Sequence, residues 1–188
     1  MFVPKEKVPP GQKVVTKFPR LDLGVVPRFD ESSWRLRVEG LVEHPLDLTL
    51  KDVLALPHVA VTADFHCVTG WTRLDNGWEG ISFKTIVERS RPRPEAKFVT
   101  VECGDGYTTS LALSDLMADN VLLAFALDGE KLTLQHGGPL RLIIPDKYGY
   151  KSAKWAERIR FTAGKEVGYW EQRGYSDTAD PWTEDRYG

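Results

Sequence analysis

Proline and glycine occur so regularly along this chain that long helices have little room. The 188 residues include 12 prolines and 16 glycines, and both residue types interrupt helices and favour turns. The segments between them are short, and several alternate apolar and polar residues as half-buried strands do. No regular succession of strand, helix and strand is visible. The sequence therefore predicts an α+β fold with mixed, mostly antiparallel sheets and short helices.

Several segments have the alternation or the continuous apolar character of strands. They are residues 34–39, 59–65, 98–102, 107–111, 121–127, 132–134, 140–144 and 157–162. Thr49, Ser82 and Ser114 are predicted to cap short helices, because their hydroxyls can accept hydrogen bonds from the first helical N–H groups. Residues 69–80 are polar and contain glycine, which predicts a loop.

The first 20 residues are rich in proline and lysine, which predicts an extended N-terminal arm. Residues 21–188 show no internal repeat, linker or low-complexity tract. They are long enough to bury a substantial core, so we expect a single domain.

The charge pattern gives no reason to expect nucleic acid or a membrane as a partner. The 25 basic and 27 acidic residues are interspersed, and the formal net charge is −2. No apolar run approaches the ~20 residues that a membrane helix needs. The N-terminus also lacks the apolar core of an export signal. These features favour a cytoplasmic protein without a membrane span.

Cys67 is the first candidate for chemistry. It follows the predicted strand 59–65, and side chains just beyond a strand end are often functional. With Cys103 it forms neither a CxxC pair nor a zinc pattern. A thiolate at this place would suit a soft or redox-active metal. The alternative is a small buried apolar side chain, which is the commoner role of a cysteine.

Two later segments have the residue types that hold an anion. Residues 136–141 (His-Gly-Gly-Pro-Leu-Arg) combine glycines, which allow close backbone approach, with an arginine suited to phosphate. Residues 148–155 add two lysines and a serine. Each segment could instead be a tight turn or a solvated basic loop. Neither GxGxxG nor GxxxxGK[ST] is present, so no Rossmann or P-loop nucleotide site is indicated.

From about Phe18 to Tyr175, the order and spacing of these segments resemble the molybdopterin-binding domain of the sulfite oxidase family. The segments that carry the resemblance are residues 34–40, 67–78, 106–111, 128–141, 150–155 and 169–175. The resemblance implies the fold of that domain and a molybdenum–molybdopterin cofactor. It also implies an oxidoreductase that transfers an oxygen atom and two electrons to or from a small sulfur or nitrogen oxo-compound, as in sulfite oxidation or sulfoxide reduction.

The resemblance implies a role for each matching position. Cys67 would ligate molybdenum as a catalytic residue. Residues that would contact the pterin or its phosphate are Cys103, His136, Arg141, Ser152, Ala153 and Lys154. Tyr175 would lie beside the substrate with catalytic Arg73, and Arg73 and Arg20 would bind the substrate anion. Because haem and iron–sulfur ligands are absent from the sequence, a separate donor or acceptor protein would exchange the electrons.

The chain also departs from the family's sulfite oxidases. His66 precedes the cysteine where those enzymes usually have arginine, and no immunoglobulin-like dimerisation domain follows. The lack of this domain and of a haem domain points to the small bacterial and archaeal members, whose better-known examples reduce sulfoxides such as methionine sulfoxide. Without the dimerisation domain we expect a monomer.

Two other functions are open. A hydrolase could use Cys67 as nucleophile with His66 or His136 as base, but His66 is adjacent and would point to the opposite face of an extended strand. A binding module could keep the fold without the cofactor. The presence of Cys67, His136, Arg141 and Lys154 together argues against that module.

Overall fold

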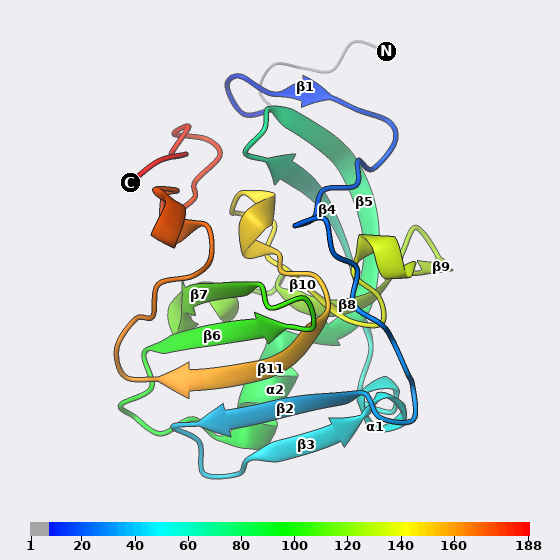
Figure 1. Ribbon diagram of the computed structural model, residues 1–188, viewed down its shortest axis with the longest axis vertical. Helices are drawn as coiled ribbons and strands as arrows, with labels where there is room; N and C mark the ends of the chain where they lie inside the picture. Colours follow the sequence, from blue (N-terminus) through cyan, green and yellow to red (C-terminus); the bar gives the residue numbers. More distant parts are fainter. Residues whose placement is uncertain (1–7) are drawn as a thin grey trace.

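Two β-sheets with short helices form the part of the chain that the computed structural model describes, residues 8–188 (Figure 1). The larger sheet has the order β1-β5-β8-β10, with β4 also on β5 and β9 on β8. Its strands are β1 (Lys13–Val14), β4 (Val59–Cys67), β5 (Trp71–Ser82), β8 (Leu122–Leu127), β9 (Glu130–Lys131) and β10 (Arg141–Ile143).

The smaller sheet has the order β3-β2-β11-β6-β7. Its strands are β3 (Leu46–Thr49), β2 (Arg35–Gly40), β11 (Ala156–Thr162), β6 (Phe98–Cys103) and β7 (Thr108–Ala112). Among the strands of residues 8–188, only the pairs β1–β5 and β2–β11 are parallel. The predicted α+β fold with mostly antiparallel sheets is therefore confirmed.

Two of the three expected helix caps are present. Helix α1 (Leu50–Leu54) follows Thr49, whose hydroxyl accepts from the Asp52 N–H at 3.1 Å in a capping box. Helix α2 (Phe83–Ser90) follows Ser82, whose hydroxyl accepts from the Lys84 N–H at 3.3 Å. Helix α3 (Leu113–Leu116) begins after Ala112 without a side-chain cap, so the prediction of Ser114 as its cap is wrong.

Residues 69–80 do not form the predicted loop. Strand β5 occupies most of this segment and pairs with β4 on one side and β8 on the other. A Cβ added at Gly80 would lie 2.2 Å from the carbonyl oxygen of Leu123, so glycine here allows two strands to approach closely. Trp78 and Ile81 in the same strand are buried. The glycines that suggest a loop are packing positions within a sheet.

The segment after Asp128-Gly129 also differs from the prediction. The hairpin returns through β9, which ends at Lys131, rather than through a strand at 132–134. Residues Leu134–His136 form a 3₁₀ turn instead. A Cβ added at Gly138 would lie 2.3 Å from the carbonyl oxygen of Leu132, so glycine at this position allows the chain to pass close to residue 132.

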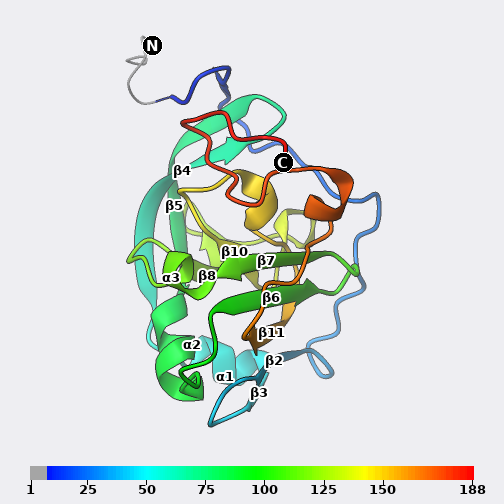
Figure 2. The same cartoon turned by 90° about the vertical axis from the view of Figure 1, so that its left-hand side faces the viewer.

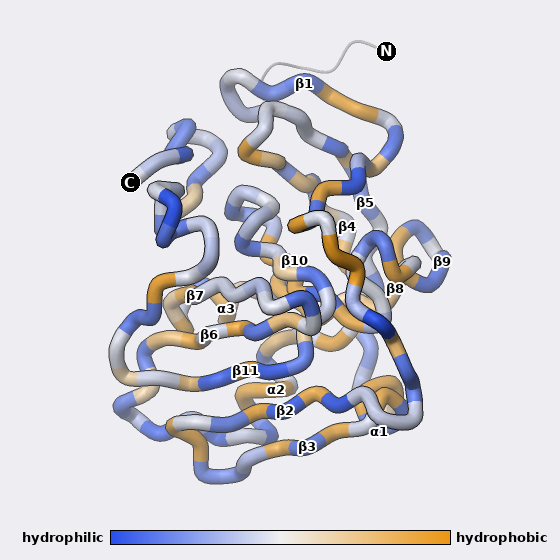
Figure 3. The backbone as a smooth tube through the Cα atoms, in the orientation of Figure 1, coloured by the Kyte–Doolittle hydropathy of each residue, from blue (hydrophilic) through white to orange (hydrophobic). Residues whose placement is uncertain are grey.

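The main hydrophobic core joins one face of the smaller sheet to the helices and to β5, β8 and β10 of the larger sheet. Figure 3 shows hydrophobic and hydrophilic residues alternating along β2, as a half-buried strand requires. A second cluster lies on the larger sheet and consists of Phe65, Trp78, Leu122, Ala124 and Ile143. Phe65 of this second cluster also lines the candidate site.

The two ends of the described chain meet beside the larger sheet (Figures 1 and 2). Strand β1 of the N-terminal arm lies parallel to β5. The C-terminal segment from residue 164 forms a 3₁₀ turn (Glu171–Arg173) but no strand, and it folds back through a bridge between Tyr175 and Tyr187. The first seven residues of the predicted arm lie outside the described residues. No helix in the described part has the length and apolar character needed to cross a membrane.

Candidate functional site

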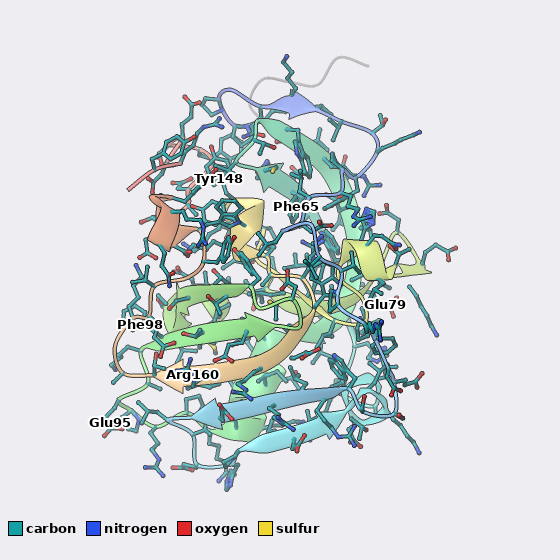
Figure 4. The ribbon with its side chains drawn as sticks, in the orientation of Figure 1. Phe65, Glu79, Glu95, Phe98, Tyr148 and Arg160 are labelled. Carbon is teal, nitrogen blue, oxygen red and sulfur yellow. The ribbon has the colours of Figure 1, made fainter. Side chains whose placement is uncertain are left out.

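A cavity of about 350 Å³ lies where the ends of β4 and β10 meet the N-terminal arm and the C-terminal segment. Phe65, labelled in Figure 4, forms part of its wall. The lining comes from segments far apart in the sequence. It consists of residues 18–23, 65, 67–69, 71, 105, 107, 135, 136, 141, 149, 150, 152–155, 170 and 175.

Cys67 is the last residue of β4 and lines this cavity. It is 7% exposed, and its Sγ lies 3.1 Å from Thr69 Oγ1. Burial raises the pKa of the thiol, while the hydrogen bonds of Thr69 and the charge of Arg186 act in the opposite direction. The thiol is therefore protonated at neutral pH, and a metal ion is the kind of partner that would convert it to a thiolate.

Arg141, in β10, is a buried cation in the cavity wall. Its Nη1 and Nη2 donate to the carbonyl oxygens of His136 and Ser152, both at 2.9 Å. Its Nε has no hydrogen-bond partner among the described residues, and the guanidinium forms no ion pair within residues 8–188. Burial lowers the pKa of Arg141 to about 9, so the group is still charged at pH 7. A buried cation without a carboxylate favours an anionic ligand.

The loop after β10 adds the other predicted anion-binding residues. Ser152 and Ala153 are buried and line the cavity, and the Ser152 hydroxyl accepts from the Ile144 N–H at 3.0 Å. Lys154 reaches the rim, where its Nζ donates to the Gln135 carbonyl oxygen at 3.1 Å. Burial, together with the charge of Arg141, lowers the pKa of Lys154 to about 8. Its Nζ also lies 3.7 Å from Asp22 Oδ2, so Asp22 pairs with both Lys154 and Arg20 at the rim.

The two lysines of this loop have different partners. The side chain of Lys151 is fully buried and pairs with Glu171 and, at 3.4 Å, with Asp177. It also donates to the Ser110 carbonyl oxygen at 3.1 Å. Lys151 therefore joins the loop to the C-terminal segment, and only Lys154 is available to the cavity.

His136 and Phe18 together close one side of the cavity. His136 Nε2 lies 3.3 Å from the Phe18 carbonyl oxygen, and the two rings pack edge to face at 5.6 Å. Phe18 also contacts Phe65 at 4.9 Å and Trp71 at 5.6 Å between ring centroids. Burial lowers the pKa of His136, so the imidazole is neutral at pH 7. The arm is thus held against the site by aromatic packing.

Tyr175, in the C-terminal segment, lines the side of the cavity opposite His136 and Phe18. Its ring packs against Trp170 at 5.0 Å and Tyr150 at 5.5 Å. The hydroxyls of Tyr107 and Tyr150 donate to main-chain carbonyls of Tyr150 and Ser176. Those two hydroxyls are already engaged, which makes Tyr175 the stronger candidate for contact with a bound molecule.

The two arginines expected to bind a substrate anion lie in different places. Arg20 lines the cavity, but its Nε pairs with Asp22 at 2.7 Å. Arg73 is not among the residues that line the cavity, so its expected contact with the substrate stays a prediction. It pairs with Asp128 and donates to Asn76 Oδ1 at 2.5 Å. These partners hold it against the β8–β9 turn, away from Cys67.

Cys103 is also outside the main cavity. It ends β6 and faces a separate, polar cavity of about 370 Å³ that includes Arg35, Glu102 and Arg158. Burial raises the pKa of its thiol well above the usual range. The expected contact of Cys103 with the cofactor is therefore not supported by its position.

Several lining residues were not singled out in the sequence. Asp105 and Tyr107 reach the cavity from the β6–β7 turn, and Thr69 lies within hydrogen-bonding distance of Cys67. Gln12 and Arg186 donate to the carbonyl oxygens of Cys67 and Val68. Thr69 could have been suggested by its position two residues after the cysteine. The others come together only through the tertiary fold.

The geometry disfavours a cysteine hydrolase. His66 is buried, and its Nδ1 lies 2.9 Å from Thr72 Oγ1, while its ring packs against Trp182. His136 is engaged by Phe18 and, at 3.4 Å, by Thr133. Neither imidazole contacts Cys67 Sγ, whose hydrogen-bond partner is Thr69.

The cavity fits a molybdenum–molybdopterin cofactor. Within residues 8–188 no three His, Cys, Asp or Glu side chains form a metal site, so a metal at Cys67 needs a cofactor that brings further ligands. The lining supplies one soft ligand at Cys67. It also supplies two cations for an anionic tail, Arg141 in the wall and Lys154 at the rim.

Gly149 leaves room for the Phe65 ring in the wall of the cavity. A Cβ added at Gly149 would lie 2.4 Å from the Phe65 ring. We expect Gly149→Ala to lower the free energy of unfolding by about 1–3 kcal/mol, because the ring must shift out of a packed wall. Denaturant titration measures this change. Gly164→Ala is the matched control, since nothing lies within 4 Å of its added Cβ, and an equal loss there would contradict the packing argument.

Comparison with known proteins gives consistent matches. A family model described as oxidoreductase molybdopterin binding domain matches residues 23–170. An uncharacterized oxidoreductase of Bacillus subtilis is 45% identical over 182 residues, which are 96% of this chain and 92% of that protein. A putative protein-methionine-sulfoxide reductase subunit of Azospira oryzae is 34% identical over 80% of this chain and 57% of its own length.

The solved structures include a similar fold. The sulfane dehydrogenase SoxCD of Paracoccus pantotrophus matches with a TM-score of 0.67 and 26% identity. That match covers 74% of this chain and 41% of the SoxCD chain. The chain therefore spans nearly all of its Bacillus relative but less than two thirds of the other two proteins.

Proposed function

This chain belongs to the oxidoreductase molybdopterin-binding domain family, and on that premise we propose that it catalyses two-electron oxygen-atom transfer on a small, uncharged sulfur oxo-compound. The observation that carries the proposal is that two side chains line the same cavity. They are the Cys67 thiol and the buried Arg141 guanidinium, which has no carboxylate partner within residues 8–188. The bound cofactor supplies the redox chemistry. The protein supplies the ligand, the pocket and the charges.

The chain's own residues divide into two groups around the cofactor. Cys67 holds the metal through its thiolate. Arg141 and Lys154 hold the anionic tail, and the buried Ser152 and Ala153 shape the wall beside it. Each charged contact is made in a site with little water, where hydrogen bonds to a phosphate are strong.

The lining favours a sulfoxide over sulfite as the substrate. Arg73 lies outside the cavity, and Arg20 is already paired with Asp22. Trp170 lines the cavity beside Tyr175, and Trp71 lines it beside Phe18, and both rings suit a thioether or sulfoxide. In the reductive direction, a sulfoxide takes up two electrons and two protons and leaves as a thioether and water. The relative from Azospira is named as a subunit of a methionine-sulfoxide reductase, which supports the same class.

Two measurements test this function together. The purified protein is analysed for molybdenum and then assayed with methionine sulfoxide, dimethyl sulfoxide, trimethylamine oxide and sulfite, using artificial electron donors and acceptors. We expect molybdenum in the protein and turnover of a sulfoxide. Protein without molybdenum from a host that makes the cofactor would favour the cofactor-free binding module. Turnover of sulfite alone would contradict the uncharged substrate. The separate electron-transfer partner, the monomeric state and the cytoplasmic location stay predictions from the sequence.

Tyr175 gives a test within the active site. We expect Tyr175→Phe to lower kcat by about 10- to 1000-fold, because the hydroxyl that orients the substrate oxygen is lost while the ring packing is kept. Molybdenum content is expected to stay unchanged. Steady-state kinetics on metal-normalised enzyme measures the effect. Tyr187→Phe is the control, since Tyr187 stacks on Tyr175 but does not line the cavity.

A further inference from the structure

The turn that carries Cys67 is held by side chains from both chain ends. Within the turn, the Gly70 N–H donates to the Cys67 carbonyl oxygen at 2.9 Å. From the N-terminal arm, Gln12 Nε2 donates to the same carbonyl at 3.1 Å. From the C-terminal segment, Arg186 Nη1 donates to the carbonyl oxygen of Val68. Gln12 and Arg186 lie outside residues 23–170, which match the family model.

Backbone pairing places Gln12 at the turn. The Lys13 N–H donates to the Gly70 carbonyl oxygen at 2.9 Å, and the Val15 N–H donates to that of Thr72 at 2.9 Å. The amide of Gln12 then bridges two neighbours, since its oxygen accepts from the Thr72 hydroxyl at 3.4 Å. The arm is therefore an added edge of the hairpin whose turn contains Cys67.

Independent contacts place Arg186 on the other side. The Ser176 N–H donates to the Arg186 carbonyl oxygen at 3.0 Å, which fixes the backbone. The guanidinium lies 5.5 Å from the ring centroid of the buried Tyr148, labelled in Figure 4. Glu184 pairs with the same guanidinium at 3.4 Å. A Cβ added at Gly11 would lie 2.7 Å from Glu184 Oε1, so the two ends are in contact.

We propose that Gln12 and Arg186 are positioning residues that clamp the turn 67–70 and hold the Cys67 thiol toward the cavity for attachment of the metal. This role rests on the proposed function of Cys67 as the metal ligand. Groups that orient a metal ligand usually matter nearly as much as the ligand for metal retention. A hydrogen bond from a guanidinium to a carbonyl is also stronger than one between neutral groups. We therefore expect Arg186 to stabilise the turn more than Gln12 does.

The test compares Arg186→Ala with Arg173→Ala in the full chain made without cofactor. Arg173 is a matched control, because it also donates to a main-chain carbonyl, at 2.7 Å, and lies over an aromatic ring, but its partner for both contacts is Tyr169. In Arg186→Ala we expect about tenfold faster hydrogen exchange at the Gly70 amide. We also expect about tenfold faster alkylation of Cys67 by iodoacetamide once each rate is divided by the thiolate fraction, because loss of the Arg186 charge by itself raises the pKa of the thiol. Gln12→Ala is expected to give the same changes at smaller size. Its control is Lys13→Ala, with an exposed side chain.

The cofactor-loaded protein provides a third readout. Arg186→Ala is expected to retain molybdenum about tenfold less tightly against dialysis than Arg173→Ala. Unchanged exchange and alkylation, or unchanged molybdenum retention, would overturn the proposal. Equal acceleration of exchange across residues 169–176 would also overturn it, because Arg186 would then only fasten the C-terminal segment. A wild-type protein without molybdenum would contradict the proposed function instead, while exchange and alkylation still decide whether the turn is clamped.

Discussion

Cys67→Ser is expected to remove molybdenum from the protein, from about one atom per chain to less than a tenth of that. The serine hydroxyl has nearly the same shape as the thiol but is a hard oxygen group that stays protonated at neutral pH. The described residues contain no cluster of three or more His, Cys, Asp or Glu suited to a metal, so they offer no second site that would hold the metal without the cofactor. Oxygen-atom transfer activity is expected to disappear with the metal. Elemental analysis of the purified variant measures the loss.

Cys103→Ala is the matched control for this experiment. Both cysteines are free and buried, but Cys103 faces the second cavity, and burial keeps its thiol protonated. We expect this variant to retain its molybdenum. Thermal unfolding of cofactor-free Cys67→Ser is expected to match that of the wild type, which separates loss of the ligand from loss of the fold. Equal metal loss in both variants would return Cys103 to the cofactor site, and full retention in Cys67→Ser would remove Cys67 from it.

Local sequence signals were sufficient for much of the fold. Thr49 and Ser82 cap helices because the capping hydrogen bonds join residues two or three apart. The strands β2 and β11 were visible because one face is buried and the other is not. The local sequence does not predict strand β5, because its glycines allow close contact with β8. A contact between segments so far apart in the sequence leaves no mark on the neighbouring residues.

Some of the predicted site residues line the cavity and others do not, because tertiary contacts decide which side chains reach it. Cys67, Arg141 and Lys154 reach one cavity because the ends of β4 and β10 meet there. Arg73 lies two residues beyond the cavity-lining Trp71, which displaces it by ~7 Å along the strand. Asp128, 55 residues later, then binds it in that position. The sequence resemblance matched the position of Arg73 but carried no information about this distant partner.

Arg141→Met is expected to weaken retention of the cofactor by about 100- to 1000-fold, because the charge of a buried guanidinium beside the anionic tail is lost. The cofactor-free protein is expected to change little, losing about 1–2 kcal/mol or less of its free energy of unfolding. Two hydrogen bonds to carbonyls disappear, but so does a buried cation that has no carboxylate. Because burial lowers the folded-state pKa of Arg141 to about 9, the cost of its charge is fully present below that pH. Measurements at pH 7 therefore include the whole cost.

Lys151→Met is the contrast that makes the result specific. Lys151 is equally buried, but its cation is paired with Glu171 and Asp177. Removing it leaves the buried Glu171 without its partner, which typically costs about 3–5 kcal/mol. We therefore expect Lys151→Met to lower stability strongly and Arg141→Met to lower cofactor retention strongly, as measured by denaturant titration and by molybdenum content. If Arg141→Met instead lost 3–5 kcal/mol while keeping its cofactor, Arg141 would be a structural cation. The guanidinium would then have no role in holding the anion.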